Sequence, residues 1–121
     1  MNLSKSEERV MQALWKLNKA SMQELISTYD EPKPATTTMA TFLKRLQEKE
    51  IVSYESQGRT RIYSPLVSKK SYFADRMNHM VHDFFNNSNA QFASYFTKET
   101  DLTREELEDL RKLIDEKLDK K

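Results

Sequence analysis

A chain of 121 residues, 37% of them hydrophobic and 32% charged, is long enough for one ordinary domain or for one compact module with an appendage. The net charge of +1 indicates no polyanionic partner, so any nucleic-acid-binding surface must be local. The absence of cysteine excludes disulfides, thiol nucleophiles and thiolate metal sites, and a single glycine cannot build a phosphate-binding nucleotide loop.

The N-terminal segment is polar and charged, which predicts that it is not a signal peptide. No apolar run approaches the roughly 20 residues that a membrane-spanning helix needs. We therefore expect a cytoplasmic protein that is not inserted into a membrane.

Two helices are predicted near the N-terminus. The pairs Ser4–Glu7 and Ser21–Glu24 have the spacing of a capping box, in which each side chain bonds the backbone N–H of the other residue. The first helix is expected over about residues 4–17, and the second is short. The few residues between them indicate that the two helices pack closely at an angle.

A third helix and a β-hairpin are predicted next. Two prolines exclude a helix over residues 31–35, and the run Thr36-Thr37-Thr38 is expected to cap the helix that follows. The segments 51–55 and 60–63 are predicted strands, joined by a turn at Gly58. The buried stripe of the third helix is expected to contain Met39, Phe42, Leu43 and Leu46.

The remainder of the chain is predicted to be helical. Ser68 is expected to cap a long helix that ends near Asn86, another helix passes through Phe92, and Thr103 with Glu106 forms a third capping box. The expected fold class is mainly α with a small β-hairpin. It comprises a winged helix-turn-helix domain over residues 1–66 and a helical C-terminal dimerisation arm over residues 67–121.

Three short helices followed by a hairpin favour DNA binding, because the last helix of such a unit enters the major groove. Residues 33–47 include basic side chains and no acidic one. Taken singly, a threonine-rich helix start is usually only a capped helix, and a pair of arginines is usually solvated surface. Their combination favours DNA contact. The predicted DNA-binding residues are Thr37, Thr38, Ala40, Thr41, Lys44 and Arg45 on the helix, and Arg59 and Arg61, two residues apart, on the hairpin.

The arm holds more aromatic and aliphatic side chains than so short a segment can bury against itself. Burial against the same arm of a second chain solves this, and two-fold symmetry is the commonest arrangement. A monomer with its arm folded back is the less favoured alternative. The predicted dimer interface contains Tyr72, Phe73, Met77, Met80, Val81, Phe84, Phe85, Phe92, Tyr95, Phe96, Leu107, Leu110 and Ile114.

Four blocks of the sequence resemble the penicillinase repressor family, which includes β-lactamase, methicillin-resistance and copper-transport repressors. They are residues 3–15, 38–46, 58–68 and 102–110, and the second matches the pattern Thr-x-x-Thr-x-x-x-Arg-Leu of the family's recognition helix. The resemblance implies a homodimeric repressor that binds dyad-symmetric double-stranded operators and controls resistance or transport genes. It also implies DNA contacts by the threonines and basic residues named above.

The sequence departs from two of the family's regulatory patterns. Copper-responsive members carry C-terminal Cys-x-Cys motifs, which this chain lacks. In β-lactam-responsive members, a membrane sensor protease system triggers cleavage of an Asn-Phe bond in the arm. The matching position here is Tyr95-Phe96, so this pair is a candidate cleavage region with an altered bond.

Other classes of function are weakly supported. His79, His82 and Asp83 could share a helix face and hold a metal, but a surface or interface group is the favoured interpretation. The acidic residues lie on helix faces among basic ones, and no nucleophile with a base is evident. We expect neither an enzyme nor a cofactor nor a metal. A winged helix used only for protein contact is the alternative to DNA binding.

Overall fold

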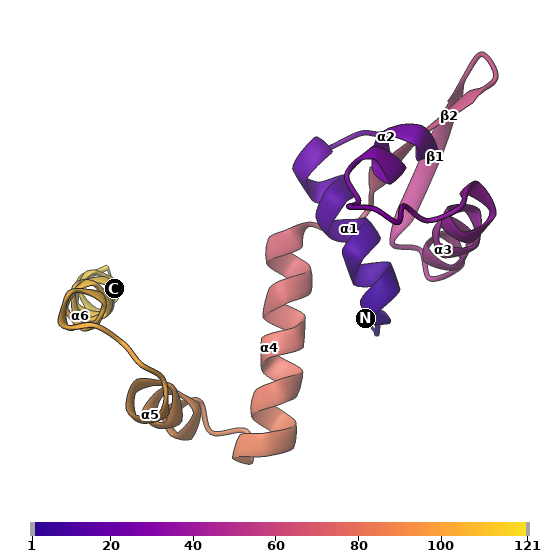
Figure 1. Ribbon diagram of the computed structural model, residues 1–121. Coiled ribbons are helices and arrows are strands. Elements are labelled where there is room, and N and C mark those ends of the chain that lie inside the picture. The colour runs from indigo at the N-terminus through magenta and orange to yellow at the C-terminus, as the bar shows by residue number, and fades with distance from the viewer. Residues whose placement is uncertain (1, 121) are drawn as a thin grey trace. The chain divides into compact units, whose positions relative to one another are not determined.

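The computed structural model describes residues 2–120 (Figure 1). They form two compact units that divide within helix α4, the first ending at Arg76 and the second beginning at Met77. The predicted fold class, mainly α with one antiparallel hairpin, is confirmed. The elements are α1 (Lys5–Leu17), α2 (Met22–Ser27), α3 (Thr36–Glu48), β1 (Val52–Gln57), β2 (Thr60–Pro65), α4 (Lys69–Phe85), α5 (Asn89–Glu99) and α6 (Arg104–Asp119).

Local capping determines where most helices begin. The three predicted capping boxes are present at the starts of α1, α2 and α6. The start of α3 differs from the prediction, because Ala35 is its N-cap and makes no side-chain hydrogen bond. The extended backbone that a cap requires falls on Ala35, with φ −67° and ψ 155°. The threonines are therefore already helical, and the prediction that they cap α3 was wrong.

The core of the first unit lies between α1, α2, α3 and the base of the hairpin. Tyr63 of β2 exchanges two backbone hydrogen bonds with Ala20, which joins the hairpin to the turn between α1 and α2. Phe42 is only partly buried, whereas the rest of the predicted α3 stripe is fully enclosed. The largest fully buried side chains are Met11, Leu14, Leu25, Met39, Leu43, Leu46, Glu7 and Val10.

The hairpin has longer strands than the sequence predicts. Val52 pairs with Pro65 at one end and Gln57 pairs with Thr60 at the other. The connecting loop is therefore Gly58-Arg59. Gly58 has φ +64°, a left-handed conformation that costs glycine little and most other residues more.

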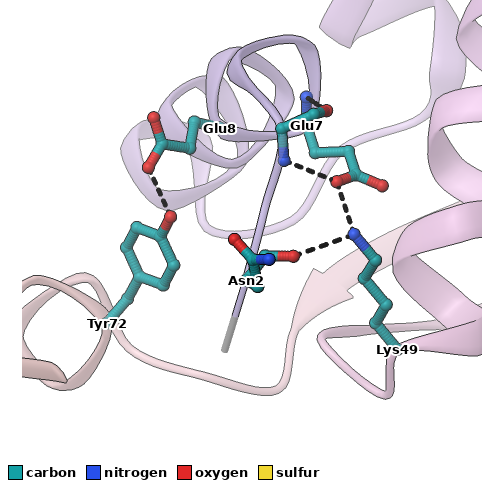
Figure 2. Close-up of polar contacts among 6 residues, drawn as sticks. Asn2, Glu7, Glu8, Lys49 and Tyr72 are labelled. Atoms are coloured by element: carbon teal, nitrogen blue, oxygen red, sulfur yellow. Dashed lines mark hydrogen bonds and ion pairs between the residues drawn. The ribbon is translucent and has the colours of Figure 1, made fainter. Parts of the chain in front are cut away.

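The first turns of α4 are packed within the first unit. Trp15 Nε1 donates a hydrogen bond to the carbonyl of Val67 at 2.8 Å, and the Trp15 ring lies 5.6 Å from that of Tyr72. The Tyr72 hydroxyl donates to Glu8, as Figure 2 shows. Burial, together with the hydrogen bond to Glu8 and the charge of Glu8, raises the pKa of Tyr72 to about 12. The functional boundary at residues 66 and 67 stays a prediction, but the compact unit extends beyond it.

The second unit contains the rest of α4, with α5 and α6. Asn86 and Asn87 both have positive φ, and Ser88 then caps α5 by accepting from the N–H of Gln91. The Phe85 ring lies 5.6 Å from that of Phe92. Neither α5 nor α6 contains a buried residue. Across residues 2–120, we find no helix with the length and apolar character needed to cross a membrane.

Candidate nucleic-acid interface

Helix α3 separates its apolar side from its polar side as predicted. Met39, Leu43 and Leu46 are buried in the core. The six predicted DNA-binding residues of this helix are all exposed, namely Thr37, Thr38, Ala40, Thr41, Lys44 and Arg45. The structure therefore brings them together on the solvent-facing surface of one helix, and their role in DNA contact stays a prediction.

The start of α3 is electrostatically suited to an anion. Its first turn contains no acidic residue, and its N-cap Ala35 supplies no side-chain acceptor. The first N–H groups of a helix lack intrahelical partners and carry partial positive charge. Thr41 Oγ1 donates to the carbonyl of Thr37 at 3.0 Å, so the hydroxyl hydrogen is used within the helix while the oxygen can still accept a hydrogen bond.

The end of α3 is fastened to the start of α1. Glu7 is only 2% exposed, and its Oε1 atom lies 2.7 Å from Nζ of Lys49, the residue that follows α3. Lys49 Nζ also donates to the carbonyl of Asn2 at 2.9 Å (Figure 2). The carboxylate that completes the α1 capping box thus also holds the end of α3. Sequence spacing indicated only the first of these roles.

The Glu7 contacts predict an acid-sensitive stability. Burial raises the pKa of Glu7, but hydrogen bonds from Lys49 and Ser4 outweigh it and hold that pKa below its ordinary value of 4.5. The stabilisation is therefore complete above the unfolded-state pKa and lost as pH falls through the folded-state value. We expect Glu7→Gln to lower the free energy of unfolding by about 1–2 kcal/mol at pH 7, the partly exposed Lys49 moderating the effect.

Urea denaturation of both proteins from neutral to acidic pH checks this. The difference between native chain and variant should shrink toward acid. An exposed control, Glu116→Gln, should show no such loss. A difference that stays constant with pH would contradict the role of the Glu7 charge.

Two basic residues contact the turn before α3 and stabilise it. Lys33 Nζ donates to the carbonyl of Tyr29, and the Arg9 guanidinium lies 4.0 Å from the centroid of the Tyr29 ring. Arg9 also donates to the carbonyl of Thr28 at 2.7 Å. The Lys33 charge is thus directed to this turn, and the basic groups on α3 itself are Lys44 and Arg45.

The two hairpin arginines occupy different elements. Arg59 lies in the two-residue loop and Arg61 lies in β2. Arg59 therefore lies just before the strand that contains Arg61. Both are exposed, and both border a groove of about 520 Å³ between the start of α2 and the hairpin. The groove is lined by Ser21, Met22, Gln23, Arg59, Thr60, Arg61 and Tyr63.

Sequence reasoning missed a residue next to the predicted hairpin site. The Arg61 Cζ atom lies 4.3 Å from the centroid of the Tyr54 ring. Tyr54 in turn lies opposite Tyr63, at a ring-centroid distance of 5.7 Å. Counting pairs outward from the Gly58 turn would have placed these side chains on one face of the hairpin.

The predicted dimer-interface residues differ widely in exposure. Tyr72 belongs to the core of the first unit, with 6% of its surface exposed, and Val81 is also buried. Met77, Phe85, Phe92 and Leu110 are partly buried. The exposed members are Phe73, Met80, Phe84, Tyr95, Phe96, Leu107 and Ile114.

One histidine of the candidate metal group contacts the carboxylate next to it in the sequence. His82 Nδ1 lies 3.0 Å from Oδ1 of Asp83, and both side chains are largely exposed. Over residues 2–120, no three His, Asp or Glu side chains form a group that could hold a metal ion.

Comparison with known proteins identifies the family. The penicillinase repressor family matches residues 3–116. A penicillinase repressor of Bacillus licheniformis is 23% identical over 120 residues, covering 98% of this chain and 94% of that protein.

Two solved structures are also similar. The solution structure of the DNA-binding domain of the repressor BlaI is 26% identical, with a TM-score of 0.52, and the match covers 59% of this chain and 88% of that one. The CopR repressor structure is 35% identical with a TM-score of 0.47, and the match covers 56% of this chain and all of that one.

The family match extends beyond the winged helix into the last helix of the arm, so it includes both parts of the predicted architecture. It confirms the resemblance inferred from the four sequence blocks, and with it a regulatory rather than an enzymatic role. The chain belongs to the penicillinase repressor family of transcriptional repressors.

Proposed function

We propose that this repressor binds double-stranded operator DNA through α3 and the hairpin. The observation that carries the proposal is the exposed, non-acidic face of α3, which lies in a unit similar to the DNA-binding domain of BlaI. An α-helix fits the major groove, and phosphates on either side favour basic side chains. This surface offers both features.

The side chains of this surface fall into two groups, one suited to base edges and one suited to phosphates. Ala40 is small and allows close approach of the helix, while the exposed Thr41 offers an acceptor oxygen and a methyl group. Such groups can accept from base amino groups or pack on thymine methyls. Lys44, Arg45 and the hairpin arginines are suited to phosphates, which position a protein without specifying sequence.

We further propose a homodimer formed by the arm. Phe84 is 78% exposed and Ile114 is 59% exposed, and α5 and α6 bury no residue within one chain. Monomeric proteins rarely leave so much apolar surface uncovered, and a two-fold partner would cover it. Two recognition helices related by a dyad would contact half-sites about one DNA turn, or a multiple of it, apart.

Repression would be relieved by separating the paired arms. Cleavage near Tyr95-Phe96 by a membrane sensor protease system is one route to this separation. The repressor would act in the cytoplasm, and the genes released from repression would be resistance or transport genes. Tyr95 is exposed, but both residues lie inside α5. Because proteases bind extended backbone, cleavage at this position requires α5 to unwind locally.

Selection from random-sequence duplex DNA at about 150 mM salt tests the proposal, since weak non-specific binding is suppressed there. Recovery of an inverted repeat is expected and would supply the operator. Recovery of a single half-site would support DNA binding and contradict the dimer. Recovery of no enriched sequence would overturn operator binding and favour a winged helix that contacts proteins.

A further inference from the structure

The ring of Tyr54 supports the guanidinium of Arg61 on one face of the hairpin. The Arg61 Cζ atom lies 4.3 Å from the ring centroid, within the range in which the negative face of an aromatic ring attracts a cation. In the strand register Tyr54 lies opposite Tyr63, so Arg61 is its diagonal neighbour. The contact gives an exposed and otherwise flexible arginine a preferred direction.

The supporting ring is itself anchored to the helical core. The Tyr54 and Tyr63 rings lie 5.7 Å apart with an interplanar angle of 51°. Tyr63 is buried, and its backbone exchanges hydrogen bonds of 2.7 Å and 3.0 Å with Ala20. A continuous set of contacts therefore leads from the turn between α1 and α2 to the Arg61 guanidinium.

The aromatic partner of Arg61 carries no negative charge, so it does not neutralise the guanidinium as a carboxylate would. Glu55, the acidic residue of the hairpin, pairs with Ile62 and lies on the opposite face from Tyr54. Among residues 2–120, Arg61 makes no ion pair with a carboxylate. A carboxylate would occupy N–H donors of the guanidinium, whereas a ring face leaves them available to an incoming phosphate.

We infer that Tyr54 is a positioning residue for DNA binding, whose ring presents Arg61 to a backbone phosphate. The inference rests on the proposed DNA-binding function and adds a residue that was not among the predicted contacts. Because a phosphate contact does not depend on base sequence, a mixed-sequence duplex is a sufficient probe and the operator is not required.

The test compares the full-length chain with four variants on that duplex over a range of salt concentrations. Arg61→Gln should reduce the slope of log affinity against log salt by about 0.9 for each protomer that loses its phosphate contact, or about 1.8 for a bound dimer. Tyr54→Leu should weaken binding about two- to fivefold, and Tyr54→Phe should leave it unchanged because the ring is kept. Combined with Arg61→Gln, Tyr54→Leu should have no further effect on binding.

The double variant separates positioning from a structural role, because lost stability would weaken binding in both backgrounds. Thermal unfolding measures that stability separately. An equal loss with and without Arg61 would overturn the inference, as would tighter binding by Tyr54→Leu, which would mean that the ring competes with DNA. An unchanged salt slope for Arg61→Gln would overturn it while leaving the proposed function standing. Absence of binding by the native chain at low salt would overturn both.

Discussion

Ile114→Asp is expected to convert the dimer to a monomer and to weaken operator binding by about 10²–10⁴-fold, the loss typical of a bivalent contact that becomes monovalent. Ile114 is 59% exposed in the single chain, so an aspartate there disturbs no intrachain core. In a dimer, the same carboxylate would be buried against apolar side chains without a partner.

Sedimentation and fluorescence anisotropy with the selected inverted repeat measure the two effects. Glu116→Gln, an exposed polar change on the same helix, should leave mass and affinity unchanged. Binding of Ile114→Asp to an isolated half-site should also be unchanged, because the first unit is intact. A dimeric Ile114→Asp protein with native affinity would exclude this face of α6 from the interface.

Leu46→Ala should lower the free energy of unfolding by about 2–5 kcal/mol. The Leu46 side chain is fully buried under α3, with 0% exposure, and its removal leaves a cavity between this helix and the core. Loss of that size approaches the whole stability of a small domain. DNA binding should fail at temperatures at which the native chain still binds. Urea denaturation followed by circular dichroism measures the change.

A neighbouring substitution should show the opposite pattern. Lys44 is exposed on the other side of α3, so Lys44→Ala should change stability by no more than about 0.5 kcal/mol. It should nevertheless reduce the salt slope of DNA binding by about 0.9 for each protomer that loses its phosphate contact, or about 1.8 for a bound dimer. If Lys44→Ala left the slope unchanged, the assignment of this side chain to phosphate would be wrong.

The helices and the hairpin were predictable because their determinants are local. A capping box involves side chains three residues apart, and an apolar stripe repeats every three to four residues. The turn depends on Gly58, which adopts positive φ. The exception, the start of α3, shows the limit of such reasoning. Threonine at a helix start indicates a cap, but the N-cap is Ala35, whose backbone is extended and whose side chain makes no hydrogen bond.

The contacts that position the candidate site were not predictable in this way. Glu7 and Lys49 are separated by 42 residues, and Tyr72 and Glu8 by 64. No short-range pattern links such pairs, since they meet only after the helices pack. The sequence predicts Tyr72 in the dimer interface, because the arm holds more aromatic side chains than it can bury against itself. The partners are on α1, and their charges and rings give no periodic signal.

The packing of Tyr72 and Val67 on α1 also determines where the chain could be cut to transfer its first unit to another repressor. A graft cut after residue 66 would leave the Trp15 indole N–H without the Val67 carbonyl and remove the ring that covers it. A graft cut after Arg76 would carry both with the first unit. The transferable module is therefore longer than the winged helix alone, and the first turns of α4 belong to it.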